Sequence, residues 1–276
     1  MTTQTQPLLS VRDLKTYFFM DEGVVKAVDG VTFDVNPGQI FGIVGESGCG
    51  KSVTMKAVLR IVEPPGKIVC GEILLNCKAD TDSCEIVDLV KLGANSKEMR
   101  SIRGAEIALI PQEPMAAFSP VHTVGNQLIE AIMLHQPIGH REARKIALQM
   151  FKDVGIHMPG QRLDEYSWQL SGGLRQRAII AMALSCNPRL LIADEPTTAV
   201  DVTTQAQVLR LLRRLQQDRN AAIIFITHDL GVIAQMASYV MVMYLGLVME
   251  QGPVDELFHS PQHPYKQALL RSIPSV

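Results

Sequence analysis

The sequence predicts an α/β protein with a mostly parallel sheet and a helical insertion, and three observations support this fold class. Short apolar runs alternate with amphipathic stretches before residue 65 and after residue 189. Residues 114–184, which lie between these parts, carry mainly helical periodicity. A glycine-rich segment at residues 45–52 joins a buried run to a helix. Alternation of this kind builds parallel strands that are covered by helices.

The composition is that of an ordinary folded chain of 276 residues. Hydrophobic residues make up 47% and charged residues 20%, which excludes a disordered chain, a collagen and a long coiled coil. The formal net charge is −2, so we expect no surface-wide basic field and no nucleic-acid partner. No apolar run approaches the roughly 18 residues of a membrane span, and the first residues lack the apolar block of a signal peptide. We therefore expect a chain that crosses no membrane by itself.

The first predicted elements of the core come early in the chain. Residues 8–19 and 24–35 alternate loosely as strands do, and residues 40–44 form the short apolar run of a buried strand. Residues 52–62 place their apolar side chains on one helical face. This helix is expected to end before Pro64, because a proline disfavours helical backbone in the residue before it.

The spacing of apolar residues in the middle of the chain predicts helices. Residues 141–154 are strongly amphipathic, and Gly155 stands where a helix C-cap belongs. A second helix is predicted at residues 173–185, after which the alternation of strands and helices returns. The later predicted elements are a strand at 190–193, a helix at 205–217, a strand at 222–227 and a helix at 230–237.

The strongest chemical motif fits G-x-x-x-x-G-K-[ST] at each fixed position and lies between an apolar strand and a helix. Its backbone N–H groups and the following helix N-terminus suit phosphate oxygens. Lys51 would place its ammonium on the β- and γ-phosphates, and the Ser52 hydroxyl would ligate Mg²⁺. Cys49 is expected to fill a small loop position rather than to act as a reactive thiol. The predicted nucleotide-binding residues here are Gly45, Glu46, Ser47, Gly48, Cys49, Gly50, Lys51, Ser52 and Val53.

Two carboxylates follow the apolar strand predicted at residues 190–193. Asp194 is placed to hold Mg²⁺, usually through water, and Glu195 to orient or deprotonate an attacking water. The plainer alternatives are a solvated acidic turn here and an ordinary glycine turn at the phosphate motif. The two motifs together favour a site that binds and hydrolyses a nucleoside triphosphate.

Residues 170–177, with the sequence LSGGLRQR, decide the family. This run resembles the signature of ATP-binding cassette (ABC) proteins. Physically it is a glycine-rich helix N-terminus and a second anion site, and Ser171 also suits an ordinary N-cap, which is compatible with that role. The resemblance implies that two cassettes pair head to tail, with Ser171, Gly172 and Gly173 of each closing on the ATP of the other.

The same resemblance assigns residues that would otherwise be read as ordinary loop positions. Gln112 is similar to the Q-loop glutamine, which reaches Mg²⁺ and the attacking water. Asp201 is similar to the aspartate that crosses the dimer interface, although it also suits a helix N-cap. His228 is similar to the switch histidine that contacts the γ-phosphate. In the family an aromatic residue stacks on adenine; Phe18 fits its spacing best and Tyr17 comes second.

The resemblance covers essentially the whole chain and refines the fold class. It implies a P-loop NTPase (RecA-like) core with an N-terminal antiparallel β-subdomain, at residues 1–112 and 186–250. A helical signature subdomain would be inserted at residues 113–185. Residues 251–276 resemble the start of the C-terminal region of the oligopeptide/dipeptide importer branch, which commonly continues further.

On this resemblance the chain is expected to be the ATP-hydrolysing subunit of an importer of oligopeptides or dipeptides. The alternatives are the same role for nickel or an oligosaccharide, or a non-transport ABC ATPase. ATP and Mg²⁺ are the expected cofactors. The expected partners are a second ATPase subunit, in a heterodimer before a homodimer, two separate transmembrane permease subunits and, indirectly, an extracytoplasmic substrate-binding protein. The chain would then be a peripheral protein at the cytoplasmic face of the cell membrane.

Overall fold

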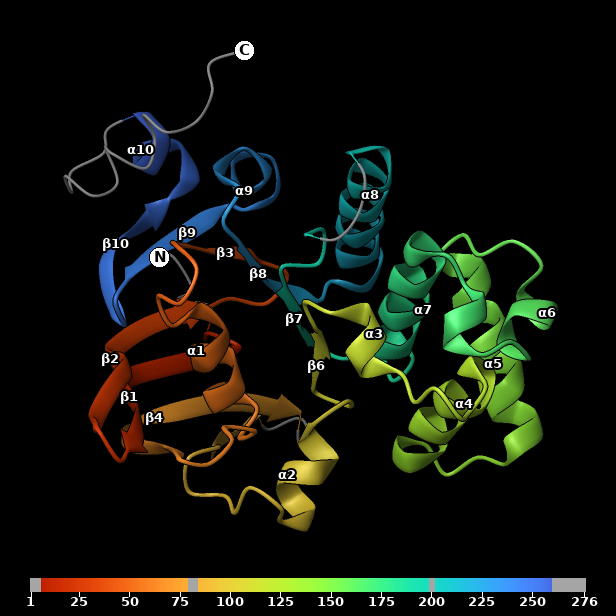
Figure 1. The fold of residues 1–276 in the computed structure, drawn as a ribbon, viewed down its shortest axis with the longest axis horizontal. Helices are drawn as coiled ribbons and strands as arrows, with labels where there is room; N and C mark the ends of the chain where they lie inside the picture. The colour runs from red at the N-terminus through yellow and green to blue at the C-terminus, as the bar shows by residue number, and fades with distance from the viewer. Residues whose placement is uncertain (1–5, 79–83, 199–201, 260–276) are drawn as a thin grey trace. The chain divides into compact units, whose positions relative to one another are not determined.

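The structure is a computed structural model that describes residues 6–78, 84–198 and 202–259. The chain divides into two compact units, Met1–Arg100 with Ala222–Val276, and Ser101–Ala221. Figure 1 traces the elements in chain order from red to blue. The predicted subdomain boundaries follow the family resemblance rather than this division, and they stay predictions.

The first unit begins with an antiparallel sheet of the strands β1 (Leu9–Met20), β2 (Gly23–Val35), β4 (Gly66–Lys78) and β5 (Cys84–Asp88). Their order is β2-β1-β4-β5. β1 and β2 confirm the first two predicted strands and form a hairpin in which Leu9 pairs with Val35. This sheet confirms the antiparallel β-subdomain that the resemblance implied.

A second sheet of the first unit is built around a fully buried strand. Its strands are β3 (Ile40–Val44), β8 (Ala222–Thr227), β9 (Tyr239–Tyr244) and β10 (Leu247–Pro253), in the order β10-β9-β3-β8. β3 and β8 match two predicted strands residue for residue, and β3 pairs in parallel with β8 and β9. Val44 pairs with Thr227, so the carboxyl ends of β3 and β8 meet at one edge. The loops that follow these strands therefore lie together.

The first helix ends earlier than predicted. α1 (Lys51–Val58) stops before residue 62 because Arg60 takes the left-handed conformation, with φ 55°. The N–H of Ile61 then donates to the carbonyl oxygen of Lys56 at 2.9 Å, a bond typical of a helix C-terminus. The apolar period continues past this point because Leu59 is still buried. The other helices of the first unit are α9 (Leu230–Met236) and α10 (Val254–His259), and α2 (Lys97–Ile102) includes the point where the chain passes from the first unit to the second.

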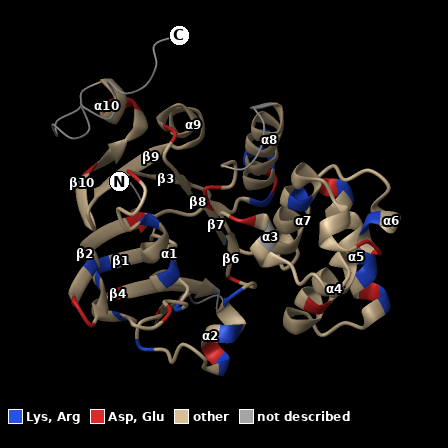
Figure 2. Cartoon of the chain, in the orientation of Figure 1, with Lys and Arg blue, Asp and Glu red and all other residues tan. Residues whose placement is uncertain are grey.

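The second unit contains the predicted helical insertion. Its helices are α3 (Pro114–Ala117), α4 (Val124–His135), α5 (His140–Asp153), α6 (Pro159–Leu163) and α7 (Gly172–Leu184), with a short 3₁₀ turn, η1, at Ser167–Gln169. α5 buries a stripe of Ala143, Ala147 and Phe151, as its period predicts, and Figure 2 shows charges of both signs along it. Gly155 takes φ 74° after α5, which confirms the predicted C-cap.

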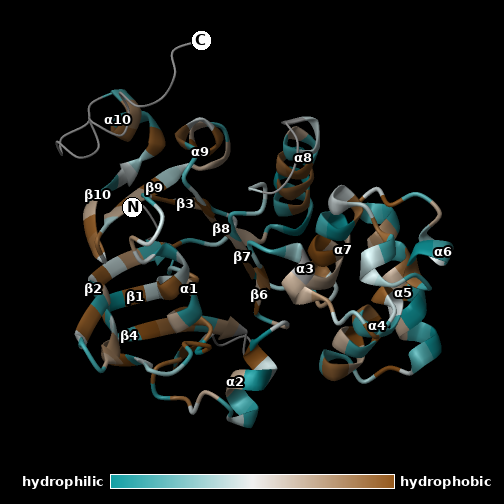
Figure 3. Cartoon of the chain, viewed as in Figure 1, coloured by the Kyte–Doolittle hydropathy of each residue, from teal (hydrophilic) through white to brown (hydrophobic). Residues whose placement is uncertain are grey.

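Two parallel strands and a long helix complete the second unit. β6 (Ile107–Ile110) and β7 (Leu190–Asp194) pair with Ile110 opposite Ala193. α8 (Val202–Arg219) extends the predicted helix at both ends, and Figure 3 shows its hydrophobic and hydrophilic bands. Its buried apolar side chains are Val208, Leu209, Leu211, Leu212 and Leu215. Within the described ranges, none of the helices has the length and apolar character needed to span a bilayer.

Candidate functional site

The glycine-rich loop follows β3 and leads into α1, as predicted. Gly45 and Gly50 take φ of 154° and 103°, values that side-chain-bearing residues rarely adopt. A Cβ at Gly50 would also collide with the carbonyl oxygen of Ala27 in β2. Gly246, between β9 and β10, donates its N–H to the carbonyl oxygen of Cys49 at 3.0 Å. The loop is therefore held between β2 and the β9–β10 turn.

Lys51 opens α1 and is only 5% exposed. Its ammonium donates to the carbonyl oxygens of Gly45 at 2.7 Å and Glu46 at 2.8 Å, so the loop wraps around the lysine side chain. This charge lies in the loop that leads into the N-terminus of α1, where backbone N–H groups have no partner within the helix. The two features together favour binding of an anion.

Cys49 lies in the same loop, with its Sγ 3.8 Å from the Nζ of Lys51. Burial raises the pKa of the Cys49 thiol, although the charge of Lys51 opposes the shift. A raised pKa keeps the thiol protonated at neutral pH, and the thiolate is the reactive form. This environment supports a packing role for Cys49.

The parallel register of β3 and β8 brings another predicted residue to the edge where the loop begins. β8 ends at Thr227, and His228 follows with an exposed side chain. Asp229 caps α9 by accepting the N–H of Gly231 at 2.8 Å and of Val232 at 3.2 Å. This cap fixes the turn that carries His228.

Phe18 and Tyr17 are neighbours on β1 but meet different partners. Phe18 is half-buried, and its ring covers Gly66 so closely that a Cβ there would clash with it. Tyr17 donates its hydroxyl to Oδ1 of Asp29 at 2.6 Å, a bond that raises the pKa of Tyr17 to about 12 and lowers that of Asp29. Lys26 lies over the Tyr17 ring, 5.5 Å from its centroid. The phenol of Tyr17 is thus engaged within the sheet, while Phe18 keeps the preferred adenine-stacking prediction.

In the second unit, Gln112 and Glu195 are in contact. The Nε2 of Gln112 donates to Oε2 of Glu195 at 3.1 Å. The pairing of Ile110 with Ala193 explains this contact, because each of the two side chains comes two residues after its strand partner. Asp194 is half-buried at the end of β7.

The backbone at Glu195 is left-handed, with φ 47°. Such strain in a residue other than glycine clusters at functional sites, where surrounding contacts hold it. One such contact comes from Thr198, whose hydroxyl donates to Oε2 of Glu195 at 2.8 Å. Thr198 was not among the predicted site residues; the signal that could have found it is a hydroxyl three residues after the carboxylate, across a turn that contains Pro196.

The signature run forms the start of α7. Ser171 is the N-cap, as its plainer interpretation predicted, and its Oγ accepts the N–H of Leu174 at 3.4 Å. A Cβ at Gly172 would meet no atom of the described residues within 4 Å, so the helix end is open at this residue, whereas a Cβ at Gly173 would lie 3.3 Å from Cγ2 of Thr204. Arg175 donates its Nε to the carbonyl oxygen of Ser167 at 2.7 Å and ties the first turn of α7 to η1.

The predicted residues thus fall into two groups, one in each unit. The loop residues, with Lys51, and His228 share one edge of the sheet in the first unit. Gln112 and Glu195 meet in the second unit, which also holds the N-terminus of α7. Asp201 lies outside the described residues. The chemical roles of these residues stay predictions.

A family model described as ABC transporter matches residues 28–198, more than half of the chain. The chain belongs to the ABC transporter family. This ABC cassette is an ATP-binding subunit with the fold and activity of the family's ATPases. A second model, described as the C-terminal region of oligopeptide/dipeptide transporters, matches residues 249–276.

The ABC cassette has relatives along nearly its whole length. A probable peptide ABC transporter ATP-binding protein of Sinorhizobium fredii is 48% identical over 99% of this chain and 80% of its own length. The dipeptide transport ATP-binding protein of Bacillus subtilis is 49% identical over 98% of this chain and 77% of its own length. The oligopeptide transport ATP-binding protein of the same organism is 47% identical over 98% and 72%, respectively.

Solved structures confirm the predicted fold of the ABC cassette. A dimeric ATP-binding cassette in a post-hydrolysis state, bound to ADP and phosphate, superposes with a TM-score of 0.77 at 23% identity. The superposition covers 89% of this chain and 98% of that chain. A part of an ABC transporter complex from Clostridium perfringens superposes with a TM-score of 0.71 at 25% identity, over 92% of this chain and 91% of that chain.

Proposed function

We propose that this ABC cassette hydrolyses ATP to drive the import of oligopeptides or dipeptides through separate membrane subunits. The observation that carries the cargo class is the match of residues 249–276 to the C-terminal region of oligopeptide/dipeptide transporters. The names of the relatives, which include peptide, dipeptide and oligopeptide transport, support the same class.

The glycine-rich loop of the first unit would bind the phosphates of ATP. A phosphate would offer Lys51 a charged acceptor in place of the carbonyl oxygens of Gly45 and Glu46, and charge-assisted bonds are the stronger ones. His228, exposed at the same edge of the sheet, would contact the γ-phosphate. Phe18 would stack on the adenine.

Mg²⁺ fits the residues that are assigned to it, because all of them offer the hard oxygen donors that this ion prefers. Ser52 would supply a hydroxyl, Asp194 a carboxylate and Gln112 an amide oxygen. Bound there, the ion would neutralise negative charge on the phosphates during their transfer.

Glu195 is the proposed general base. A water that attacks the γ-phosphorus must lose a proton, and a positioned carboxylate can accept it. Gln112, whose amide contacts this carboxylate, would help to place the water. The proton would go to the carboxylate, and the bond between the γ-phosphorus and the bridging oxygen would break.

Two cassettes would pair head to tail, so that α7 of one chain closes on the ATP bound by the other. The exposed N-terminus of α7 at Ser171 and Gly172 supports this arrangement, because it offers N–H groups to an outside anion. Asp201 would cross the interface. A heterodimer with a second ATPase subunit is proposed before a homodimer.

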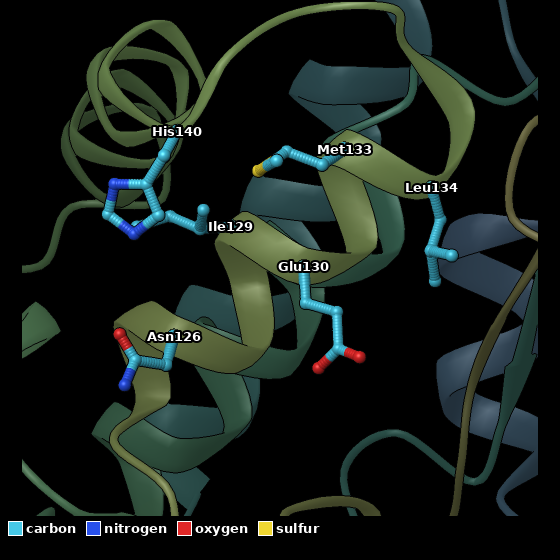
Figure 4. Close-up of a pocket in the computed structure, with 6 residues that line it drawn as sticks. All are labelled: Asn126, Ile129, Glu130, Met133, Leu134 and His140. Atoms are coloured by element: carbon cyan, nitrogen blue, oxygen red, sulfur yellow. The ribbon is translucent and has the colours of Figure 1, made fainter.

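The helical insertion offers a groove to a permease. This open groove has a volume of about 440 Å³ and is lined by Asn126, Ile129, Glu130, Met133 and Leu134 of α4 and His140 of α5. In Figure 4, Ile129, Met133 and His140 face a common space. Met133 is 42% and Leu134 75% exposed, and exposed apolar side chains around a groove favour a partner helix. We assign this groove to a cytoplasmic helix of a permease subunit, which would hold the cassette at the cytoplasmic face.

Uptake of labelled peptides by cells tests the whole proposal. Glu195→Gln in place of the native chain should abolish uptake of a dipeptide and of a longer peptide, because loss of a general base slows turnover by about 10²–10⁴-fold. The purified variant should still bind ATP and should accumulate as an ATP-bound dimer. Wild-type hydrolysis by this variant would falsify the base assignment. Loss of nickel or oligosaccharide uptake, with peptide uptake intact, would move the cargo to one of those alternatives.

The groove has its own test. Leu134→Lys places a charge on its most exposed apolar side chain and should reduce peptide uptake, while ATP binding by the purified chain stays at the wild-type level. Gln149→Lys adds the same charge to an exposed position of α5 and is the matched control. Equal uptake by the two variants would remove the groove from the proposal.

A further inference from the structure

We infer that Thr198 is a positioning residue that holds the carboxylate of Glu195 in its reactive orientation. The Thr198 hydroxyl donates to Oε2 of Glu195 at 2.8 Å. This bond is shorter than the 3.1 Å bond that the same oxygen accepts from Gln112. The inference rests on the proposed role of Glu195 as general base.

A tight turn makes the contact between Thr198 and Glu195 rigid. The N–H of Thr198 donates to the carbonyl oxygen of Glu195 at 3.2 Å, and Pro196 occupies the second position, where its ring presets φ. Thr197, between Pro196 and Thr198, is buried. The β-branched side chain of threonine is itself stiff about its first torsion. Thr198 therefore donates two hydrogen bonds to Glu195, one from its backbone N–H to the carbonyl oxygen and one from its hydroxyl to the carboxylate.

A glutamate needs such a donor because its carboxylate does not orient itself. The last torsion of the side chain is broad and roughly twofold, so a carboxylate without a fixed donor turns relative to its target. The left-handed backbone of Glu195 sets where the side chain begins, but it leaves that last torsion open. A hydroxyl fixed on one oxygen removes this freedom, and correct orientation contributes directly to rate.

Thr198 and Gln112 are attached to Glu195 in different ways. Gln112 follows another strand, β6, and the proposed function requires its amide to reach the metal and the water. Thr198 belongs to the same turn as Glu195, so its bond does not depend on where Gln112 goes. The hydroxyl can therefore keep the carboxylate oriented while Gln112 engages the nucleotide.

Two substitutions separate the hydroxyl from the rest of the side chain. Thr198→Val keeps the size and the branching but removes the donor, whereas Thr198→Ser keeps the donor. The measurement is phosphate release by the full chain, assembled with its membrane partners, as a function of ATP concentration. Thr198→Val should lower kcat about tenfold while KM for ATP stays within about twofold. Thr198→Ser should stay close to the wild type.

The outcomes divide cleanly. Wild-type kcat in Thr198→Val overturns the inference, and so does an equal loss in Thr198→Ser, because the γ-methyl group or local packing would then be responsible. A rise in KM alone overturns it as well. Thr198 is exposed, and thermal unfolding together with ATP binding checks that the valine variant is folded. Glu195→Gln, measured in parallel, separates the two ideas: if it hydrolyses ATP normally the base assignment is wrong, and if only Thr198→Val does so the positioning role is wrong.

Discussion

Lys51 carries a buried charge that the loop backbone already stabilises. Its ammonium bonds two carbonyl oxygens, without which burial of the charge would be strongly unfavourable. Carbonyl dipoles are weaker partners than ionised phosphate oxygens. The residue is therefore held in place before a nucleotide arrives, and it gains when one does.

Lys51→Ala should weaken nucleotide binding by about one to two orders of magnitude, because hydrogen bonds to charged groups contribute about 1.5–3 kcal/mol. Titration calorimetry with ATP measures the change. Lys56→Ala is the matched control, since Lys56 is an exposed lysine of the same helix whose ion pair is with Glu63. If the two variants bound ATP equally, the loop would be misread.

The hydrogen bond between Tyr17 and Asp29 predicts that the stability of the fold depends on pH. The pKa of Tyr17 is raised to about 12 by its hydrogen bond to Asp29, with smaller contributions from desolvation and neighbouring charges. Because the folded-state pKa lies above the unfolded-state pKa of about 10, the bond from the protonated phenol stabilises the fold fully below that pH. This stabilisation is lost as the pH rises through the folded-state pKa. Absorbance of tyrosinate should therefore show one late step among the five tyrosines.

Two variants assign that late step. Tyr17→Phe should remove it, and Asp29→Asn should shift it toward ordinary tyrosine values because the hydrogen-bonding carboxylate is gone. A late step that survives in Tyr17→Phe would show that another tyrosine titrates there.

At the scale of elements, predictions succeeded where the signal is local. β3 and β8 are short apolar runs with turn residues beside them, and their observed bounds equal the predicted ones. The predicted end of α1 was wrong because apolar periodicity reports which side chains are buried, not where the helix ends. Leu59 stays buried although the helix has already ended at Val58. The strands β4, β5, β6, β9 and β10 were not predicted. β4 and β10 contain glycine and polar residues that blur the alternation, whereas β5, β6 and β9 are short runs of four to six residues, a length at which an apolar pattern is ambiguous.

The site follows the same rule. The loop around Lys51 could be predicted because all of its parts are adjacent in sequence. The contact of Gln112 with Glu195 joins residues 83 positions apart and depends on the register of β6 against β7, which the sequence does not reveal. The bond from Thr198 depends on a left-handed glutamate, a conformation that residue preferences disfavour.

Phe151 tests the packing of α5. Phe151→Ala should destabilise the second unit by about 3–5 kcal/mol, because the ring is fully buried and leaves a cavity. Denaturant unfolding followed by tryptophan fluorescence measures this, since Trp168, the one tryptophan of the chain, belongs to the same unit. Lys145→Ala, at an exposed position of α5, should change stability by less than about 0.5 kcal/mol. Equal effects of the two variants would contradict the helical phase of α5.

At the scale of the whole molecule, the chain carries two helix N-termini suited to anions. α1 begins beside the buried Lys51, whereas α7 begins at an exposed cap. Under the proposed function they serve different nucleotides, one bound by the chain itself and one bound by a companion. Turnover then belongs to the pair of cassettes rather than to the single chain.

Ser171→Arg tests this arrangement by filling the open end of α7. In a Glu195→Gln background, the parent should form ATP-dependent dimers in sedimentation velocity, and the added arginine should abolish them without weakening ATP binding to the chain itself. Turnover per wild-type chain should also fall on dilution. A monomer that hydrolyses ATP at full rate with Ser171 altered would contradict the head-to-tail arrangement.

The contact between Gly50 and the carbonyl oxygen of Ala27 has a practical consequence for engineering. Gly246 also lies close to the carbonyl oxygens of Lys26 and Ala27 in β2. The hairpin of β1 and β2 therefore restricts the conformation of the loop that is proposed to bind the triphosphate. A fragment that begins at β3 would keep every residue of the motif but would lose β2, against which the loop packs. Anyone transplanting this motif into another scaffold would have to carry the hairpin along.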